Sequence, residues 1–281
     1  MAPEPADTRQ PPLCRVVLVG VTGRMGQALL RAAPGFPQLI VTGAIASTGS
    51  LALGRDAGEL AGLGAANLPV TGDLPRALAQ ADVVIDFSSA AATAGTVAAC
   101  RAARKPLLLG TTGFTATLEP QLEAATRDIA LLVAANTSLG ATLLMALTRT
   151  AAKSLPVSFD IDILDLHHRL KQDAPSGTAL ALGRVAAQAR GVPVPSPGDA
   201  LTPRAGARPV GEIEFAALRA GDGVGEHTVL FSGHGETLAL THRASDRGIF
   251  ARGALAAALW LVAQPPGRYD MENFLGLKTA T

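Results

Sequence analysis

Residues 15–26 read RVVLVGVTGRMG, and this stretch decides the fold of the first half of the chain. Its first five residues form an apolar, β-branched run, which is typical of a strand buried on both faces. The following turn has the spacing G-x-x-G-x-x-G from Gly20 to Gly26, and a helix is predicted from about Met25 to Ala33. Such a turn lets backbone N–H groups approach a pyrophosphate, although any tight strand-to-helix connection also favours glycine.

Strands and helices alternate downstream of this unit. Further buried strands are predicted at 39–46, 83–87, 106–109 and 129–134, with helices at 90–104 and 119–127. Strands that alternate with helices imply a parallel, doubly wound sheet covered on both faces. The first part of the chain is therefore expected to be a Rossmann-like α/β domain.

The pattern changes after about Asn136. Strands are predicted at 159–166, 211–219, 227–231 and 237–242. The last three are joined by GDGVG (221–225) and SGHGE (232–236), glycine turns typical of hairpins. This predicts an α+β second domain with a mixed or antiparallel sheet. An apolar helix at 249–263 is expected to pack back against the first domain.

These patterns predict three parts of the chain. Residues 1–12 are rich in proline and polar residues and are expected to be a disordered tail. Residues 13–136 together with 246–281 are expected to form a dinucleotide-binding domain. Residues 137–245 are expected to form the second domain.

Length, charge and cysteine content narrow the class of protein. The 281 residues suffice for two modest domains, and the formal net charge of +1 without a basic block gives no indication of nucleic-acid binding. No apolar run reaches the ~18 residues of a membrane-spanning helix. Cys14 and Cys100 fit no disulfide or metal spacing, which favours a reduced, cytoplasmic compartment.

Two more loops follow predicted strands and carry hydroxyl and amide groups. They read GTTGF (110–114) and AANTS (134–138). Ligands bind at the carboxyl ends of the strands of a doubly wound sheet, so both loops are candidates to line a nicotinamide. Ordinary turn chemistry explains either loop equally well when it is taken singly.

The segment after the second predicted strand bears on the choice of cofactor. An acidic residue there holds the adenosine ribose of NADH and repels the 2′-phosphate of NADPH. This chain has Ala46, Ser47 and Thr48 instead. Because small hydroxyls do not repel a phosphate, we expect NADPH to be tolerated alongside NADH, with Ser47 at the cofactor.

Residues 167–180, HHRLKQDAPSGTAL, carry the candidate chemistry. His167 ends a predicted strand, and a histidine gives up a proton near neutral pH. Lys171 is a second candidate proton donor and a counter-charge for a carboxylate. Residues 176–178 (SGT) open a predicted helix, whose free N–H groups bind anions. Together they suit a small acidic molecule that is held and protonated, whereas each alone is consistent with a solvated loop and a helix cap.

The remaining polar candidates are expected to have no catalytic role. Three further histidines are expected to be surface or packed residues: His227, His234 and His242. Three aspartates alternate with apolar residues and are expected to face solvent: Asp160, Asp162 and Asp165. The spacing of these groups favours no metal site.

Segments spread over nearly the whole chain resemble the dihydrodipicolinate reductase family. They are VGVTGRMG (19–26), DFS (86–88), GTTGF (110–114), AANTS (134–138), HHRLKQDAPSGTA (167–179), GEHTV (225–229) and THRASDRGIFARGAL (241–255). The histidine-lysine-SGT block is highly specific to this family, whereas the glycine turn alone is not.

The resemblance implies a homotetramer that reduces a cyclic, unsaturated imine dicarboxylate with NADH or NADPH in lysine (diaminopimelate) biosynthesis. It also implies that residues 137–245 bind the substrate and form the oligomer. By analogy, His167 and Lys171 supply the protons. The substrate is expected to be held by His168, Gly177 and Thr178, with Lys171 and Ser176 as further candidates. The residues expected to contact the cofactor are Gly20, Val21, Thr22, Gly23, Arg24, Met25, Gly110, Thr111, Thr112, Ala134, Ala135, Asn136 and Thr137.

Two other functions remain open at this point. A semialdehyde dehydrogenase shares the predicted plan but needs a nucleophilic cysteine on an accessible loop, and Cys14 and Cys100 lie beside a predicted strand and in a predicted helix. A non-catalytic NAD(P)H sensor accounts for the glycine turn but not for residues 167–180. Turnover separates the two classes, because a sensor binds NAD(P)H without oxidising it.

Overall fold

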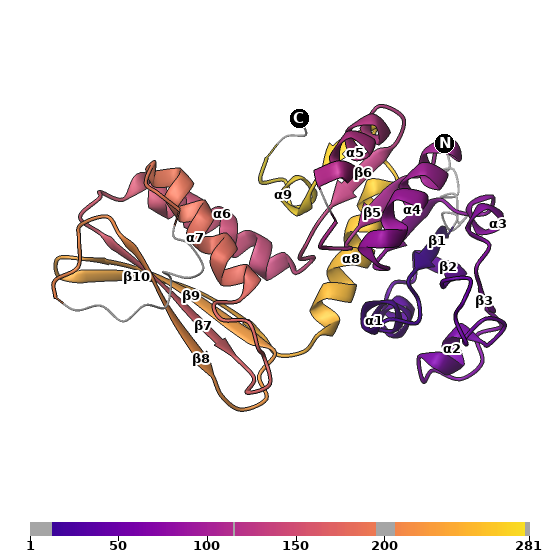
Figure 1. Cartoon of the computed structure of the whole chain (residues 1–281), viewed down its shortest axis with the longest axis horizontal. Coiled ribbons are helices and arrows are strands. Elements are labelled where there is room, and N and C mark those ends of the chain that lie inside the picture. Colours follow the sequence, from indigo (N-terminus) through magenta and orange to yellow (C-terminus); the bar gives the residue numbers. More distant parts are fainter. Residues whose placement is uncertain (1–12, 115, 195–205, 279–281) are drawn as a thin grey trace, which may run out of the picture. The chain divides into compact units, whose positions relative to one another are not determined.

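The computed structural model describes residues 13–114, 116–194 and 206–278, and the chain divides into two compact units (Figure 1). The first unit runs up to Ala135 and resumes at Phe250–Phe274. The second comprises Asn136–Ile249 and Leu275–Lys278. The tail predicted at residues 1–12 lies outside the described residues.

A seven-stranded parallel sheet forms the centre of the first unit. Its strands are β1 (Cys14–Val19), β2 (Leu39–Ile45), β3 (Val70–Thr71), β4 (Val83–Asp86), β5 (Leu107–Leu109), β6 (Ala130–Val133) and β11 (Gly267–Tyr269). Their order is β11-β6-β5-β4-β1-β2-β3. Strands β2 and β3 therefore lie on one side of β1, and the strands that follow them in the chain lie on the other side. This order confirms the predicted doubly wound, Rossmann-like sheet.

Both faces of this sheet are buried in its central part, which explains why strands such as β1 and β5 carry consecutive apolar residues. In β1, Val16 and Leu18 belong to one core cluster and Val17 and Val19 to another. The first cluster includes residues of α1 (Arg24–Ala32) and α8 (Gly248–Leu261). The second includes residues of α3 (Leu74–Leu78), α4 (Ala90–Ala102) and α5 (Glu119–Thr126).

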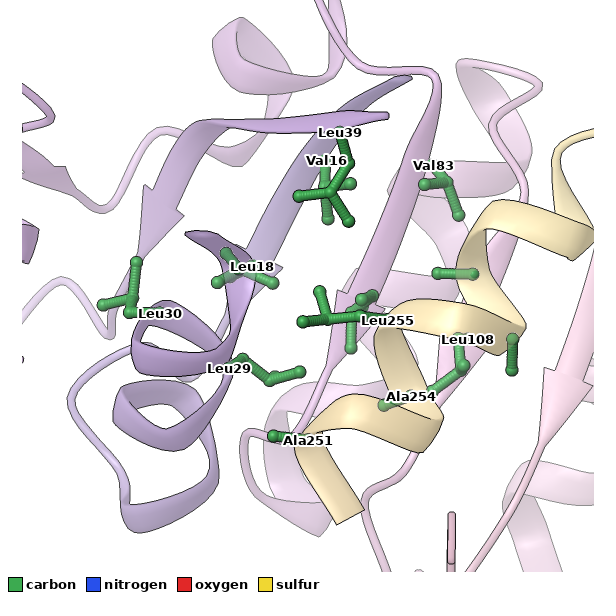
Figure 2. Close-up of a cluster of buried hydrophobic side chains, with 14 of the residues drawn as sticks. Val16, Leu18, Leu29, Leu30, Leu39, Val83, Leu108, Ala251, Ala254 and Leu255 are labelled. Atoms are coloured by element: carbon green, nitrogen blue, oxygen red, sulfur yellow. The ribbon is translucent and has the colours of Figure 1, made fainter. Parts of the chain in front are cut away.

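Helix α8 completes the first of these cores from the far end of the chain. Figure 2 shows Ala251, Ala254 and Leu255 among side chains of α1 and the central strands, including Leu29 and Leu108. Alanine is common in α8, and its short side chain allows the helix to lie close to the sheet. Burial of apolar surface therefore holds this helix in the first unit.

The second unit contains a four-stranded sheet with two helices on one face. The strands are β7 (Asp160–His167), β8 (Ile213–Arg219), β9 (Gly225–Gly233) and β10 (Glu236–Ala244), in the order β10-β9-β7-β8. Helices α6 (Leu139–Ser154) and α7 (Gly177–Arg190) lie side by side across the sheet (Figure 1). Strand β9 is antiparallel to β7 and β10, whereas β7 and β8 are parallel, so the predicted mixed sheet is confirmed.

The hairpin predicted between β8 and β9 is wrong, whereas that between β9 and β10 is confirmed. Strand β7 lies between β8 and β9. Helix α7 carries the chain from the end of β7 back to the start of β8, which makes these two strands parallel neighbours. The GDGVG turn then passes the end of β7, where the His168 amide donates to the Gly223 carbonyl.

Several short elements complete the described residues. They are the helices α2 (Ala57–Leu60) and α9 (Met271–Phe274) and the 3₁₀ turns at Ala33–Gly35 and Ala116–Leu118. Within the part of the chain that the structure describes, every helix is too short or too polar to cross a membrane.

We expect Leu255→Ala to lower the free energy of unfolding of the first unit by about 2–5 kcal/mol, because it leaves a cavity in a fully buried position. Trp260, the chain's single tryptophan, lies on the same helix, so urea denaturation followed by its fluorescence reports on this unit. Leu51 is fully exposed, and Leu51→Ala should cost less than about 0.5 kcal/mol. Equal losses in the two variants would contradict the packing of α8.

Candidate active site

The glycine turn after β1 is shaped by close backbone contacts. Gly20 has a φ of +83°, and a Cβ there would lie 2.7 Å from the Phe87 carbonyl oxygen. A Cβ at Gly26 would lie 2.3 Å from the Gly20 carbonyl oxygen. Gly23 starts α1 without a capping side chain, and the first turn of α1 has no acidic residue. The exposed backbone there fits a phosphate, which needs N–H donors and close approach.

The residues of the turn differ in solvent exposure. Thr22, Gly23 and Arg24 are exposed, Gly20 and Met25 are partly buried, and Val21 is buried in the core. The backbone amides of Gly20 and Val21 both donate to the Ile45 carbonyl, which ties the turn to the end of β2. Of the turn residues, Thr22, Gly23 and Arg24 thus offer the accessible groups for a ligand.

The end of β2 lies at the same edge of the sheet. Ala46 is buried, and its amide donates to the Thr71 carbonyl. Ser47 and Thr48 are exposed. Ser47 is therefore the first residue after β2 whose side chain is free to meet a ribose.

A buried carboxylate organises the ends of β4 and β5. Asp86 is fully buried, and one of its oxygens accepts from the Ser88 amide at 2.7 Å and from the Thr111 hydroxyl at 3.3 Å. The Phe87 ring covers Gly110, where a Cβ would lie 2.2 Å from the ring. Thr112 remains exposed. Asp86 was noted in the sequence only as part of the DFS segment, yet its hydrogen bonds to Ser88 and Thr111 fix the loop that contains Thr111.

The loop after β6 crosses from the first unit into the second. Ala134 is buried and Ala135 is exposed, and both belong to the first unit. Asn136 and Thr137 belong to the second, where the Asn136 side chain accepts from the Ser138 amide and Thr137 is buried. The cofactor candidates at 134–137 are thus divided between the units.

In the second unit, β7 places His167 beside a buried acid. His167 Nδ1 lies 2.8 Å from Asp165 Oδ1, an ion-pair distance, although the two atoms are not aligned as a linear hydrogen bond. His227 Nε2 of β9 lies 3.3 Å from the same oxygen. The other oxygen accepts from the Ser176 amide at 2.7 Å and from Arg219 at 3.0 Å. Asp165 therefore joins three strands and the start of α7.

The expectation that Asp165 faces solvent is wrong. It is 1% exposed and shares the buried face of β7 with Ile161 and Ile163, whereas Asp160 and Asp162 lie on the opposite face. Burial acts to raise the pKa of Asp165. Contacts with His167, His227, the Ser176 amide and Arg219 outweigh burial and hold the pKa of this carboxyl well below its usual range.

Lys171 and His168 already have partners within the unit. Lys171 Nζ lies 2.7 and 2.9 Å from the two carboxylate oxygens of Asp173, and this ion pair lowers the pKa of Asp173. His168 Nε2 lies 3.4 Å from an Arg247 nitrogen. Asp173 and Arg247 were not singled out by the sequence analysis. An incoming carboxylate would replace Asp173 at Lys171.

The start of α7 contains one engaged residue and two accessible ones. The Ser176 hydroxyl accepts from the Ala179 amide at 3.2 Å and lies 3.0 Å from His227 Nε2, so Ser176 caps the helix. Gly177 is exposed and Thr178 is partly exposed. The groups of α7 that remain available to an anion are those of Gly177 and Thr178.

Asp165, His167 and His227 also offer ligand atoms within 4.8 Å of one another, an arrangement that could hold a metal ion. The sequence spacing did not anticipate this cluster. The guanidinium of Arg219 and the Ser176 amide already balance the Asp165 carboxylate. We therefore assign the cluster to hydrogen bonding and ion pairing.

Neither cysteine has the environment of a nucleophile. Burial is the main cause that raises the pKa of the Cys14 thiol, to about 11, and burial also raises the pKa of Cys100. The reactive form of cysteine is the thiolate. Both thiols are thus held protonated, which opposes the semialdehyde dehydrogenase alternative.

Two family models match consecutive halves of the chain. Residues 14–137 match the N-terminal domain of dihydrodipicolinate reductase, and residues 140–275 match its C-terminal domain.

Two curated relatives are similar along their whole length, and both are named 4-hydroxy-tetrahydrodipicolinate reductase. The protein from Anaeromyxobacter dehalogenans is 45% identical over 270 residues, which cover 95% of this chain and 99% of the relative. The protein from Halorhodospira halophila is 47% identical over 263 residues, which cover 92% and 98%.

The fold is also similar to that of solved structures. Dipicolinate-bound dihydrodipicolinate reductase from Paenisporosarcina sp. TG-14 is 25% identical with a TM-score of 0.74, and the match covers 93% of this chain and 99% of that one. An amine dehydrogenase from Mycobacterium smegmatis, 13% identical with a TM-score of 0.59 over 92% and 95%, shares the fold alone. With both halves matched and relatives near half identical throughout, the chain belongs to the dihydrodipicolinate reductase family of oxidoreductases.

Proposed function

We propose that the chain reduces 4-hydroxy-tetrahydrodipicolinate, a cyclic unsaturated imine dicarboxylate, to tetrahydrodipicolinate with NADH or NADPH in lysine biosynthesis. The observation that carries this proposal is the grouping of His167, His168, Lys171 and the accessible start of α7 in one unit. The relatives named above bear the corresponding reductase name, and the similar solved structure contains dipicolinate, a flat dicarboxylate.

The first unit is proposed to bind the dinucleotide. When bound, the cofactor supplies the hydride. Glycine at positions 20 and 26 allows the backbone of the turn to pack closely, and the start of α1 has no capping side chain. This arrangement leaves space for a pyrophosphate, which supports binding at Gly20–Met25. Thr111, Thr112 and the 134–137 segment are proposed to line the nicotinamide end. Ser47 is proposed to lie at the adenosine ribose, where it accepts either cofactor.

The second unit is proposed to bind and protonate the substrate. Lys171, Gly177 and Thr178 would hold a carboxylate by a charge and by backbone and hydroxyl donors. His168, with Arg247 beside it, adds positive charge for an anion. His167 and Lys171 are proposed as the proton donors. The 4-hydroxyl group leaves as water, the hydride adds to one carbon of the resulting unsaturated ring, and a proton adds to the neighbouring carbon. A pure sensor of NAD(P)H would need none of these groups.

We expect His167→Gln and Lys171→Met each to lower kcat by about 10²–10⁴-fold, because a positioned general acid contributes that much. Dinucleotide Kd, measured by fluorescence titration, should stay within about twofold. His234 and Lys153 are exposed, so His234→Gln and Lys153→Met are matched controls with near-normal kcat. Near-wild-type kcat in both test variants would refute the proton-donor assignment, and a wild type that binds NAD(P)H without oxidising it would favour the sensor.

Ser47→Asp should raise the KM for NADPH at least about tenfold and leave that for NADH unchanged or lower. The new carboxylate repels the 2′-phosphate but accepts a hydrogen bond from the ribose. Ser47→Asn has nearly the same shape without the charge and serves as the control in steady-state kinetics. An unchanged NADPH KM in Ser47→Asp would show that residue 47 does not face the ribose.

The chain is further proposed to be a homotetramer. The face of the second sheet opposite α6 and α7 carries a row of apolar side chains that includes Leu164, Leu166 and Leu218, which are 38%, 36% and 63% exposed. Leu166 and Leu218 are direct neighbours on β7 and β8. An exposed apolar face of this kind is typical of a subunit interface.

The free cysteines also favour the reduced environment of the cytoplasm.

The double variant Leu166→Lys/Leu218→Lys should therefore dissociate the tetramer into smaller species, because charged side chains resist burial. Light scattering coupled to size-exclusion chromatography gives the mass. Leu51→Lys introduces one such charge at a fully exposed position of the first unit and should leave the mass unchanged. A monomeric wild type, or a double variant that keeps the mass of a tetramer, would refute this interface.

A further inference from the structure

The buried carboxylate of Asp165 has its two oxygens turned to different partners. Oδ1 lies 2.8 Å from His167 Nδ1 and 3.3 Å from His227 Nε2. Oδ2 accepts from the Ser176 amide and from Arg219. One oxygen therefore serves the imidazoles, and the other serves the start of α7.

The first oxygen determines which nitrogen of His167 carries the proton in the neutral ring. A carboxylate is only an acceptor, so the neighbouring Nδ1 must be the protonated nitrogen. Nε2 is then the atom that exchanges a proton with a ligand. The His167 ring packs against Gly225, where a Cβ would come within 2.6 Å of Nε2, so the position of the ring requires glycine at 225. Catalytic hydrogen bonds are often poorly aligned in the absence of substrate and tighten in the substrate complex, so the misalignment of this pair does not oppose a catalytic role.

The second oxygen fixes the groups that surround the anion site. By accepting from the Ser176 amide, it sets the residue that caps α7, and Gly177 and Thr178 follow directly. Arg219 also donates to the Asp173 carbonyl at 2.6 Å, and the Asp173 side chain pairs with Lys171. The carboxylate thus reaches Lys171 through Arg219 and Asp173.

We propose that Asp165 is the positioning residue of this site: it holds His167 as the Nδ1–H tautomer, with Nε2 as the proton-exchanging atom, and ties it to the anion-binding start of α7. This inference deepens the proposed reductase function and rests on it for its catalytic part. Asp165 touches no substrate in this scheme, because it acts through His167, Ser176 and Arg219.

Asp165→Asn gives a sharp test because the surroundings dictate how the amide turns. The Ser176 amide and Arg219 both donate, so the amide oxygen must take the Oδ2 position. The amide NH₂ then faces His167 Nδ1, which must become an acceptor. We expect ¹⁵N NMR of the imidazole, assigned with His167→Gln, to show Nδ1–H in the wild type and Nε2–H in Asp165→Asn.

The kinetic expectation is a fall in kcat of at least about 100-fold in Asp165→Asn, with dinucleotide Kd within about twofold. Asp162→Asn is the matched control: it lies on the same strand but faces Arg208, at 2.6 Å, on the opposite side of the sheet. It should keep both the wild-type His167 tautomer and near-normal kcat.

An Nε2–H tautomer in the wild type would overturn the proposal, and this measurement needs no variant that must fold. A lower melting temperature of Asp165→Asn with unchanged kcat would also overturn it, because the residue would then be structural only. The tautomer is measured without cofactor or substrate. An inactive wild type with the Nδ1–H tautomer would therefore count against the reductase function and leave the positioning of the ring intact.

Discussion

A parallel sheet that buries both faces must be covered on both sides, and this requirement shapes the first unit. Its strands offer apolar side chains in two directions, so each face needs helices of its own. The segment between β1 and Ala135 covers one face with α3, α4 and α5 but supplies only part of the cover for the other. Helix α8, together with Tyr269 of β11 and Met271 of α9, supplies the rest.

The second unit differs from the first, because its sheet has one face covered by helices and one face that is open. On the covered face the apolar pattern of β7 is interrupted by Asp165 and His167. Burying a carboxylate is costly unless donors surround it, and here an amide, a guanidinium and two imidazoles do so. The polar interruption of an apolar face marks the chemical site, and the apolar open face marks the proposed subunit interface.

The fold was predictable where the signal was local. The run RVVLV and the glycine turn after it indicate a buried strand and a tight connection from adjacent residues alone. The place of β8 was not predictable in this way, because its partner is chosen by the crossover through α7 and not by the glycine turn that follows it. Strand β3 has two residues, too few for any periodicity.

The candidate site shows the same difference between local and long-range sequence signals. His167, Lys171 and the SGT segment stand close together in the sequence, so the proposed site could be assembled from the sequence alone. Asp165 was misjudged because it was grouped with Asp160 and Asp162, although an odd separation places it on the opposite face. Arg219, which donates to Asp165, is 54 residues away in the sequence, and no local sequence pattern predicts such a contact.

The return of α8 has a consequence for the order in which the protein is made. During synthesis β1 is made early, and α8 is complete only after the segment Asn136–Ile249 of the second unit. Until then, one face of the nascent first sheet lacks a helix that buries Leu18 and Leu108. The second unit is contiguous in this interval and is able to fold while the first waits. The unit that contains β1 is thus the last to bury its sheet, because part of the cover arrives only with α8.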